Sequence, residues 1–363
     1  MKQVIVLLSL LSVAIGCKTN KSYTVDSSKY EKILDSIIHN MKENSVYTNN
    51  VDWNQLEKEM HNIYNEKDSI NTLKSSIKHM LTVLGDFHGS SYVNGEQIKA
   101  NVKRTRTVAY DYDSDKYIGK MSSIYQKRLK ESNSIFSNLI DKSIGYIQIP
   151  MILNNMGIDS INIAYTLKIR DKLCKLEKNN PKGYIIDLRT NLGGTMYPMF
   201  SGLGILFPNL KLGGDSKDEK TFYSKWAIIE GNMHYEDYAI PNMPAITCNI
   251  KLGNRKVAVI IGRYTNSSGE AVASGLKGQK NVKLFGEQTA GASSTISWIP
   301  ISNNIQLNPT VAYYMSKDGT LNKDGIVPDV NIIEDYYIEK PLQSKAITQA
   351  IEWINTSYKN DHK

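Results

Sequence analysis

The sequence predicts a parallel α/β core preceded by a helical domain. From residue 143 onwards, continuous apolar strands alternate with helical segments, which is typical of a parallel sheet covered by helices. Before that point, apolar residues recur at helical spacing over residues 28–85. Of the 363 residues 41% are hydrophobic and 22% are charged, so the composition is that of a folded protein.

The first residues predict export from the cytoplasm. The apolar region of residues 4–15 is too short to span a bilayer comfortably. It ends in Ala14-Ile15-Gly16-Cys17, which is similar to a bacterial lipobox, whose cysteine is lipidated and becomes the mature N-terminus. We therefore expect a signal peptide over residues 1–16, lipidation of Cys17 and a tether over residues 17–27. The protein is then expected on the cell envelope, facing the periplasm or the outside. The alternative is an ordinary secretory signal with a chance cysteine.

Charge and cysteine usage narrow the classes of partner. The net charge is +8, but Lys and Arg are scattered, so nucleic-acid binding is not expected. No C-x-x-C motif or His-rich cluster occurs, which argues against a structural metal. Besides Cys17, only Cys174 and Cys248 remain. These two could pair in an oxidising compartment, although the sequence does not show their separation.

The chain divides into four predicted segments after the tether. Residues 28–90 are expected to form an N-terminal helical domain, and residues 91–141 a connector with one helical run. Residues 142–335 carry the alternating pattern of the core, with buried strands at 144–150, 184–188 and 257–261. Residues 336–363 end the chain in an amphipathic helix.

The strand at 257–261 leads through a short turn into a helix rich in small residues. Ser267 stands at this junction, where free helix N–H groups and the helix dipole favour developing negative charge. That position suits an acyl-transfer nucleophile, and the N–H of Ser268 is placed to serve an oxyanion hole. The alternative is that Ser267 merely caps the helix.

Thr265-Asn266-Ser267-Ser268-Gly269-Glu270, followed by Gly286-Glu287-Gln288-Thr289-Ala290-Gly291, resembles the nucleophile region of the S41 peptidases. This family comprises the carboxyl-terminal processing proteases, the tricorn core proteases and their relatives. The resemblance spans about residues 52–329 and implies a ClpP/crotonase-like spiral ββα core with an N-terminal helical cap domain. It also implies a serine peptidase that acts on peptides or proteins without a cofactor or metal.

The resemblance assigns further residues to the site. The family's nucleophile lies three residues before the glutamate, which makes it Ser267 here, and Glu270 is expected to brace the helix or a nearby loop. His88, in Leu84-Gly85-Asp86-Phe87-His88, matches the family's catalytic histidine. Asp187 to Gly194 matches an Asp-x-Arg-x-Asn-x-Gly-Gly loop, so the N–H groups of Gly194 and Ser268 are expected to form the oxyanion hole.

The third catalytic member does not match cleanly. Processing proteases use a downstream lysine as base, but Ala292 occupies the matching position, so the tricorn-like layout with His88 as base is expected. Where many relatives of that layout have glutamate, this chain has Asn322, with Asp324 two residues later. Either residue is a candidate to orient His88. The PDZ domain of the processing proteases is expected to be absent, because the connector is too short and lacks its binding loop.

The resulting hypothesis is peptide hydrolysis through an acyl-enzyme in the cell envelope. One alternative is a weak or inactive binding lipoprotein that keeps the S41 fold without turnover. A second is an acyl-CoA enzyme of the crotonase type, against which the export signal argues.

Overall fold

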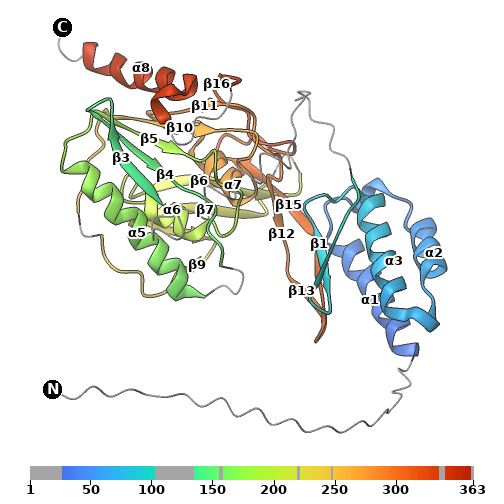
Figure 1. Cartoon of the computed structure of the whole chain (residues 1–363). Helices are drawn as coiled ribbons and strands as arrows, with labels where there is room; N and C mark the ends of the chain where they lie inside the picture. The colour runs from blue at the N-terminus through green and yellow to red at the C-terminus, as the bar shows by residue number, and fades with distance from the viewer. Residues whose placement is uncertain are drawn as a thin grey trace, which may run out of the picture.

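The computed structural model describes residues 27–102, 135–154, 158–218, 221–246, 248–334 and 340–360 (Figure 1). The predicted signal peptide, Cys17 and nearly all of the tether lie outside the described residues, as does most of the predicted connector.

Three helices form the predicted helical cap: α1 (Ser27–Asn44), α2 (Trp53–Ile63) and α3 (Ser69–Leu84). Asp52 caps α2, because its side chain accepts from the N–H groups of Asn54 and Gln55. Gly85 ends α3 in the left-handed conformation that glycine adopts without strain. Short 3-10 turns at Thr48–Asn50 and Glu66–Asp68 join the helices.

The helical cap rests on a four-stranded antiparallel sheet of order β13-β14-β1-β2. Its strands are β1 (Ser90–Val93), β2 (Glu96–Lys99), β13 (Ile299–Ser302) and β14 (Ile305–Asn308). One face of this small sheet is apolar and packs on the helices through Val93, Ile98, Ile305 and Leu307. The start of the predicted connector is thus a strand pair. It depends on β14, which lies more than 200 residues further along the chain.

The central sheet has the order β16-β11-β10-β5-β4-β3 and is parallel except for the β3–β4 pair. Its strands are β3 (Phe136–Ile140), β4 (Ile144–Gln148), β5 (Gly183–Asp187), β10 (Lys256–Ile261), β11 (Val282–Gly286) and β16 (Val330–Asn331). The apolar runs predicted from the sequence are its middle strands, which are buried on both faces.

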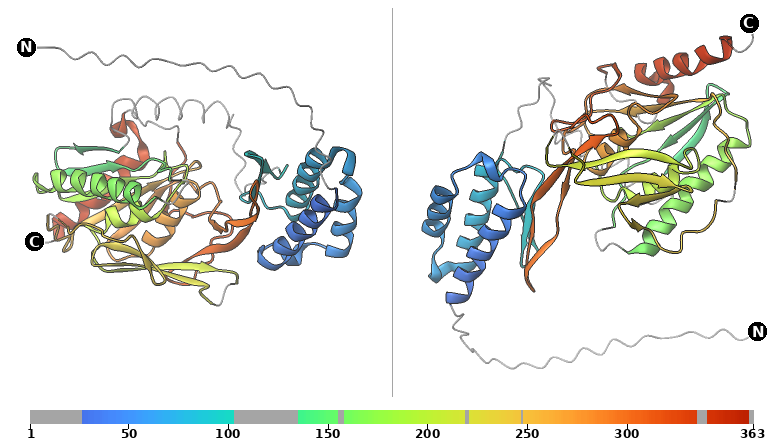
Figure 2. Two further views of the ribbon diagram at one scale, coloured as in Figure 1. Left: turned by 90° about the horizontal axis from the view of Figure 1, so that it is seen from below. Right: turned by 180° about the vertical axis from the view of Figure 1, so that it is seen from behind.

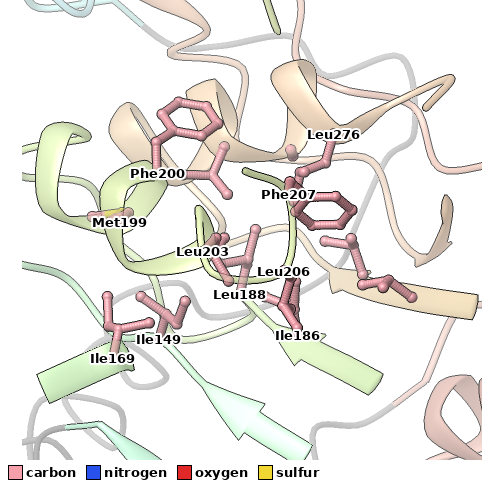
Figure 3. Close-up of a cluster of buried hydrophobic side chains, with 14 of the residues drawn as sticks. Ile149, Ile169, Ile186, Leu188, Met199, Phe200, Leu203, Leu206, Phe207 and Leu276 are labelled. Carbon is pink, nitrogen blue, oxygen red and sulfur yellow. The ribbon is translucent and has the colours of Figure 1, made fainter. Parts of the chain in front are cut away.

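Helices cover both faces of the central sheet. On one face lie α5 (Asp159–Glu177), α6 (Tyr197–Leu203) and α7 (Ser268–Leu276), and their apolar side chains form the main core with Ile186 and Leu188 (Figure 3). On the other face α8 (Lys345–Asn360), preceded by a 3-10 turn at Pro341–Gln343, packs on Ile185 and Ile260.

A second six-stranded sheet, antiparallel throughout, has the order β12-β15-β6-β7-β8-β9. It comprises β6 (Leu210–Ser216), β7 (Ser224–Ile229), β8 (Asn232–Tyr235), β9 (Tyr238–Ala239), β12 (Ser294–Ile296) and β15 (Thr310–Ser316). Together with the central sheet and its helices it confirms the ClpP/crotonase-like core.

A disulfide joins Cys174 of α5 to Cys248 in the segment before β10, with their Cα atoms 6.0 Å apart. The sequence left this pairing open.

Candidate active site

Ser267 occupies the turn between β10 and α7 with a positive φ of 48°. Positive φ is uncommon for a residue with a side chain, and such strain concentrates at functional sites. Its own N–H donates to Glu270 Oε2 at 2.9 Å, and this contact fixes the turn. Ser267 is therefore both the N-cap residue of α7 and a strained residue of the turn.

Glu270 is fully buried and braces the nucleophile turn, as expected. Besides the Ser267 N–H, it accepts from the hydroxyl of Thr289 at 2.6 Å and from the N–H of Gly291. It thus ties the start of α7 to the loop after β11.

The glycine loop that follows β5 packs directly against the nucleophile. Asn191 shapes it, because its side chain accepts from the Gly193 N–H at 3.0 Å and its carbonyl accepts from the Asn266 N–H at 2.9 Å. A Cβ at Gly193 would lie 2.9 Å from the Cβ of Ser267, so only glycine allows this approach.

Gly194 and Ser268 are the two residues whose N–H groups are expected to form the oxyanion hole. Within the described residues, neither the N–H of Gly194 nor that of Ser268 donates to another protein atom. The Ser268 hydroxyl donates to the Gly194 carbonyl at 2.5 Å, which ties the two residues together. This contact engages the Ser268 hydroxyl with a backbone carbonyl.

Tyr314 of β15 is a site residue that the sequence did not reveal. Burial raises the pKa of its phenol well above the ordinary value, and a hydrogen bond with Ser267 offsets part of that rise. The phenol therefore stays neutral beside the nucleophile. Nothing in a strand of alternating β-branched and aromatic residues singles it out.

His88 is held by the loop that ends α3. Asp86, which is fully buried, accepts from the Gly89 N–H at 2.7 Å, the Thr310 hydroxyl at 2.6 Å and the Thr310 N–H at 3.0 Å. Burial raises the pKa of Asp86, while these contacts and the His88 N–H lower it in part. The aspartate of the Leu-x-Asp-x-His motif thus anchors the histidine loop to the start of β15.

The imidazole of His88 meets a serine where a third catalytic member was expected. Its Nδ1 lies 2.8 Å from Oγ of Ser294 on β12. Two adjacent serines follow Ala292, and no signal in the sequence distinguishes Ser294 from its neighbour.

Neither residue expected to orient His88 occupies that place. Asn322 lies in a buried polar cluster behind α7, where its amide donates to Ser274 Oγ at 3.2 Å and to Ser316 Oγ at 3.1 Å. Asp324 is exposed, and its carbonyl accepts from Gln288 at 3.0 Å. The physical reason is that the closing segment pairs with the end of β15 opposite to Thr310, to which the His88 loop is fastened.

A cleft of about 1770 Å³ brings the other predicted site residues together. Ser267, His88, Gly194 and Ser268 all line it, as do Ser294 and Tyr314. On one side the cleft is bounded by the face of the small sheet that turns away from the helices, including Tyr92, Gln97 and Gln306. On the other side stand aromatic residues of the core, namely Tyr197, Tyr235 and Tyr238.

The described residues show no group of three or more His, Cys, Asp or Glu side chains placed to hold a metal ion. Among the helices of the described residues, none is long and apolar enough to span a membrane.

A strained serine at a helix start, a glycine loop and a histidine in one cleft of an α/β core define a serine hydrolase. Residues 143–332 match the sequence model of peptidase family S41, so the chain belongs to this family and is a serine peptidase. The resemblance drawn from the motifs is thereby confirmed.

Two relatives illustrate the match. The nisin-resistance protein of Lactococcus lactis subsp. lactis is 28% identical over 334 residues, which cover 91% of this chain and 88% of that protein. The carboxy-terminal processing protease CtpA of Bacillus subtilis (strain 168) is 28% identical over 205 residues, or 56% of this chain and 38% of that protein.

Two solved structures share the fold. A lipoprotein from Streptococcus agalactiae superposes with a TM-score of 0.59 at 19% identity, covering 96% of this chain and all of that one. The photosystem II D1 C-terminal processing protease has a TM-score of 0.52 at 16% identity, covering 88% of this chain and 98% of that one.

Proposed function

We propose that this protein is a serine endopeptidase that cleaves peptides or proteins of the cell envelope through an acyl-enzyme, with Ser267 as nucleophile and His88 as base. The observation that carries the proposal is the strained Ser267 in one cleft with His88, whose Nδ1 is held by Ser294. If Nδ1 carries the proton and donates it to Ser294, Nε2 is the ring nitrogen that takes the role of base.

The chemical steps follow from these positions. His88 takes the hydroxyl proton as Ser267 Oγ bonds to the scissile carbonyl carbon. The N–H groups of Gly194 and Ser268 hold the oxyanion, each lowering the barrier by about 3 kcal/mol if well aimed. His88 then passes the proton to the leaving amine, and water hydrolyses the ester by the reverse route.

Nδ1 of His88 is paired with Ser294 and not with a carboxylate, and this difference determines the kcat that we expect. A serine hydroxyl can accept the Nδ1 proton and orient the imidazole, but it cannot stabilise imidazolium as a negative charge does. In one serine protease triad, replacing Asp by Asn lowers kcat about 10⁴-fold. We therefore expect slow turnover.

We propose an envelope location with a lipid anchor at Cys17. The lipobox-like Ala14-Ile15-Gly16-Cys17 supports it, and so does the Cys174–Cys248 disulfide, because disulfides persist outside the cytoplasm. The relative named nisin-resistance protein makes nisin a reasonable probe substrate.

The test is cleavage of a diverse synthetic peptide library together with nisin, read by mass spectrometry. We expect specific cuts by the wild type and by Ser268→Ala, and none by Ser267→Ala. Loss of cleavage in Ser268→Ala with retention in Ser267→Ala would contradict the assignment. A folded wild type that binds peptides without cutting any of them would favour the binding-protein alternative.

A further inference from the structure

Asp215 of β6 is a buried carboxylate that contacts the strand carrying Ser294 and has no part in the chemical steps proposed for catalysis. Asp215 of β6 is fully buried, and no ion pair with a cation forms there within the described residues. A carboxylate is costly to bury unless hydrogen bonds satisfy it. Burial raises the pKa of Asp215, and hydroxyl donors offset part of the rise.

Three hydroxyls from three different strands satisfy this carboxylate. Thr295 on β12 donates to Oδ1 at 2.6 Å. Ser224 on β7 and Tyr235 on β8 donate to Oδ2 at 2.8 Å and 2.5 Å. Thr295 is thus the contact through which Asp215 reaches β12.

Thr295 directly follows Ser294, the partner of His88. Successive side chains of a strand point to opposite faces, so Ser294 meets His88 on one face while Thr295 meets Asp215 on the other. β12 has only three residues, lies at the edge of its sheet and shifts register between Thr295 and Ile296. So short a strand has few backbone contacts to fix it, and its side-chain anchors matter correspondingly more.

We propose that Asp215 is a positioning residue, which holds β12 through Thr295 and thereby holds Ser294 Oγ against Nδ1 of His88. The inference rests on the proposed function, because it concerns the orientation of the proposed base. Asp215 would then help to orient the imidazole of His88 through β12, without contacting the imidazole itself.

The sharpest probe is the exchange of Thr295 for Val and for Ser. Val keeps the shape but removes the donor to Asp215, whereas Ser keeps the hydroxyl. We expect Thr295→Val to lower kcat about 10-fold to 100-fold with KM within twofold, because small displacements of a catalytic group cost this much. Thr295→Ser should retain most of the wild-type kcat.

The matched control is Ser224→Ala, which removes another donor to the same carboxylate from a strand that does not carry Ser294. We expect its kcat to stay within about threefold of the wild-type value. If Ser224→Ala lowers kcat as far as Thr295→Val, the loss comes from removing any donor to Asp215 and not from releasing β12. The proposal is then wrong.

A second readout does not depend on turnover. In ¹⁵N spectra of the imidazoles, assigned with His88→Gln, the wild type should show the proton of neutral His88 on Nδ1. Thr295→Val should show a mixture of tautomers, and Thr295→Ser the wild-type pattern. An unchanged pattern in Thr295→Val overturns the proposal even if the wild type cleaves no peptide. If the wild type cleaves no peptide but Thr295→Val shows the expected tautomer change, the proposed function is contradicted and the positioning role of Asp215 is not.

Discussion

Ser267 owes its position to the residues around it. Glu270 fixes its N–H, and Gly193 allows the loop after β5 to reach within contact of its side chain. The short motif points to Ser267 as the candidate nucleophile because its spacing to Glu270 reflects this local geometry. The partner of His88 is different: Ser294 lies 206 residues away along the chain, and no local spacing encodes that contact.

Replacing Gly193 by Ala tests the packing of the glycine loop. The new Cβ would press on the Cβ of Ser267 at 2.9 Å and displace it, so we expect activity to fall about 100-fold. Gly319→Ala is the control, because it also has positive φ but has open space around the new Cβ. Peptidase assays with thermal unfolding of both variants check the prediction. Equal activity losses in the two variants would show that backbone strain, and not contact with Ser267, is responsible.

Asn322 should matter for stability and not for catalysis. Its amide satisfies Ser274 and Ser316 in a buried cluster, so Asn322→Ala should lower the free energy of unfolding by about 1–3 kcal/mol. The kcat of the folded enzyme should change little. Asn322→Asp should not raise kcat, whereas it would if residue 322 oriented His88. Urea unfolding and steady-state kinetics measure the two effects separately.

At the scale of elements, an ion pair between Asp187 and Arg189 fixes the glycine loop at the end of strand β5. Asp187 at its end is fully buried, accepts from the Tyr146 hydroxyl at 2.7 Å and binds Arg189 through both carboxylate oxygens. Burial would raise the pKa of Asp187, but Arg189 holds it below its usual value. Arg189 also reaches Ser344 at 3.1 Å, which connects the loop to the segment before α8.

Arg189→Met should reverse the pH dependence that comes from Asp187. In the wild type the lowered pKa contributes stability that is fully present above about pH 4, the unfolded value, and is lost as the pH falls through the folded pKa. Without Arg189, burial raises the pKa, so the variant loses stability as the pH rises above about 4. We expect a deficit of about 3–5 kcal/mol at pH 7 that shrinks towards pH 4.

Urea unfolding at several pH values measures this deficit. Lys175→Met, which removes an exposed ion pair with Asp171, is the control and should cost less than about 1 kcal/mol at every pH. A deficit in Arg189→Met that grows on acidification would contradict the interpretation.

Elements were predictable from the sequence where their signal is local. The middle strands of the central sheet were found because each is a continuous apolar run, and α7 because of its small residues. The hairpin of β1 and β2 was missed because its polar outer face faces the cleft, which leaves too few apolar positions to signal a strand. The pairing of β6 to β9 has no local signal, since it is set by contacts within the second sheet.

At the scale of the whole molecule, segments far apart in the sequence build the cleft together. The helical cap and the small sheet lie at one end of the molecule, and β12 and β15 connect that end to the core (Figure 2). The Asp86–Thr310 contact fastens the His88 loop to β15. Ser267 and His88 therefore line one cleft only when both parts have folded.

Attachment to the membrane is testable on the full chain. Lipidation of Cys17 should place the protein in the detergent phase on phase separation and allow labelling with an alkyne-bearing fatty acid. Cys17→Ser should lose the label and move to the aqueous phase with unchanged peptidase activity. A wild type that leaves the cell as a soluble protein without the label would show an ordinary secretory signal instead.

An activated serine is the feature on which every catalytic step above depends. The most direct measurement exposes the purified protein to a fluorophosphonate and maps the adduct by mass spectrometry. We expect one adduct, on Ser267, that forms in the wild type and in Asn322→Ala and is lost in His88→Ala. An adduct on Ser268, or labelling of folded protein that persists without His88, would contradict the assignment of nucleophile and base.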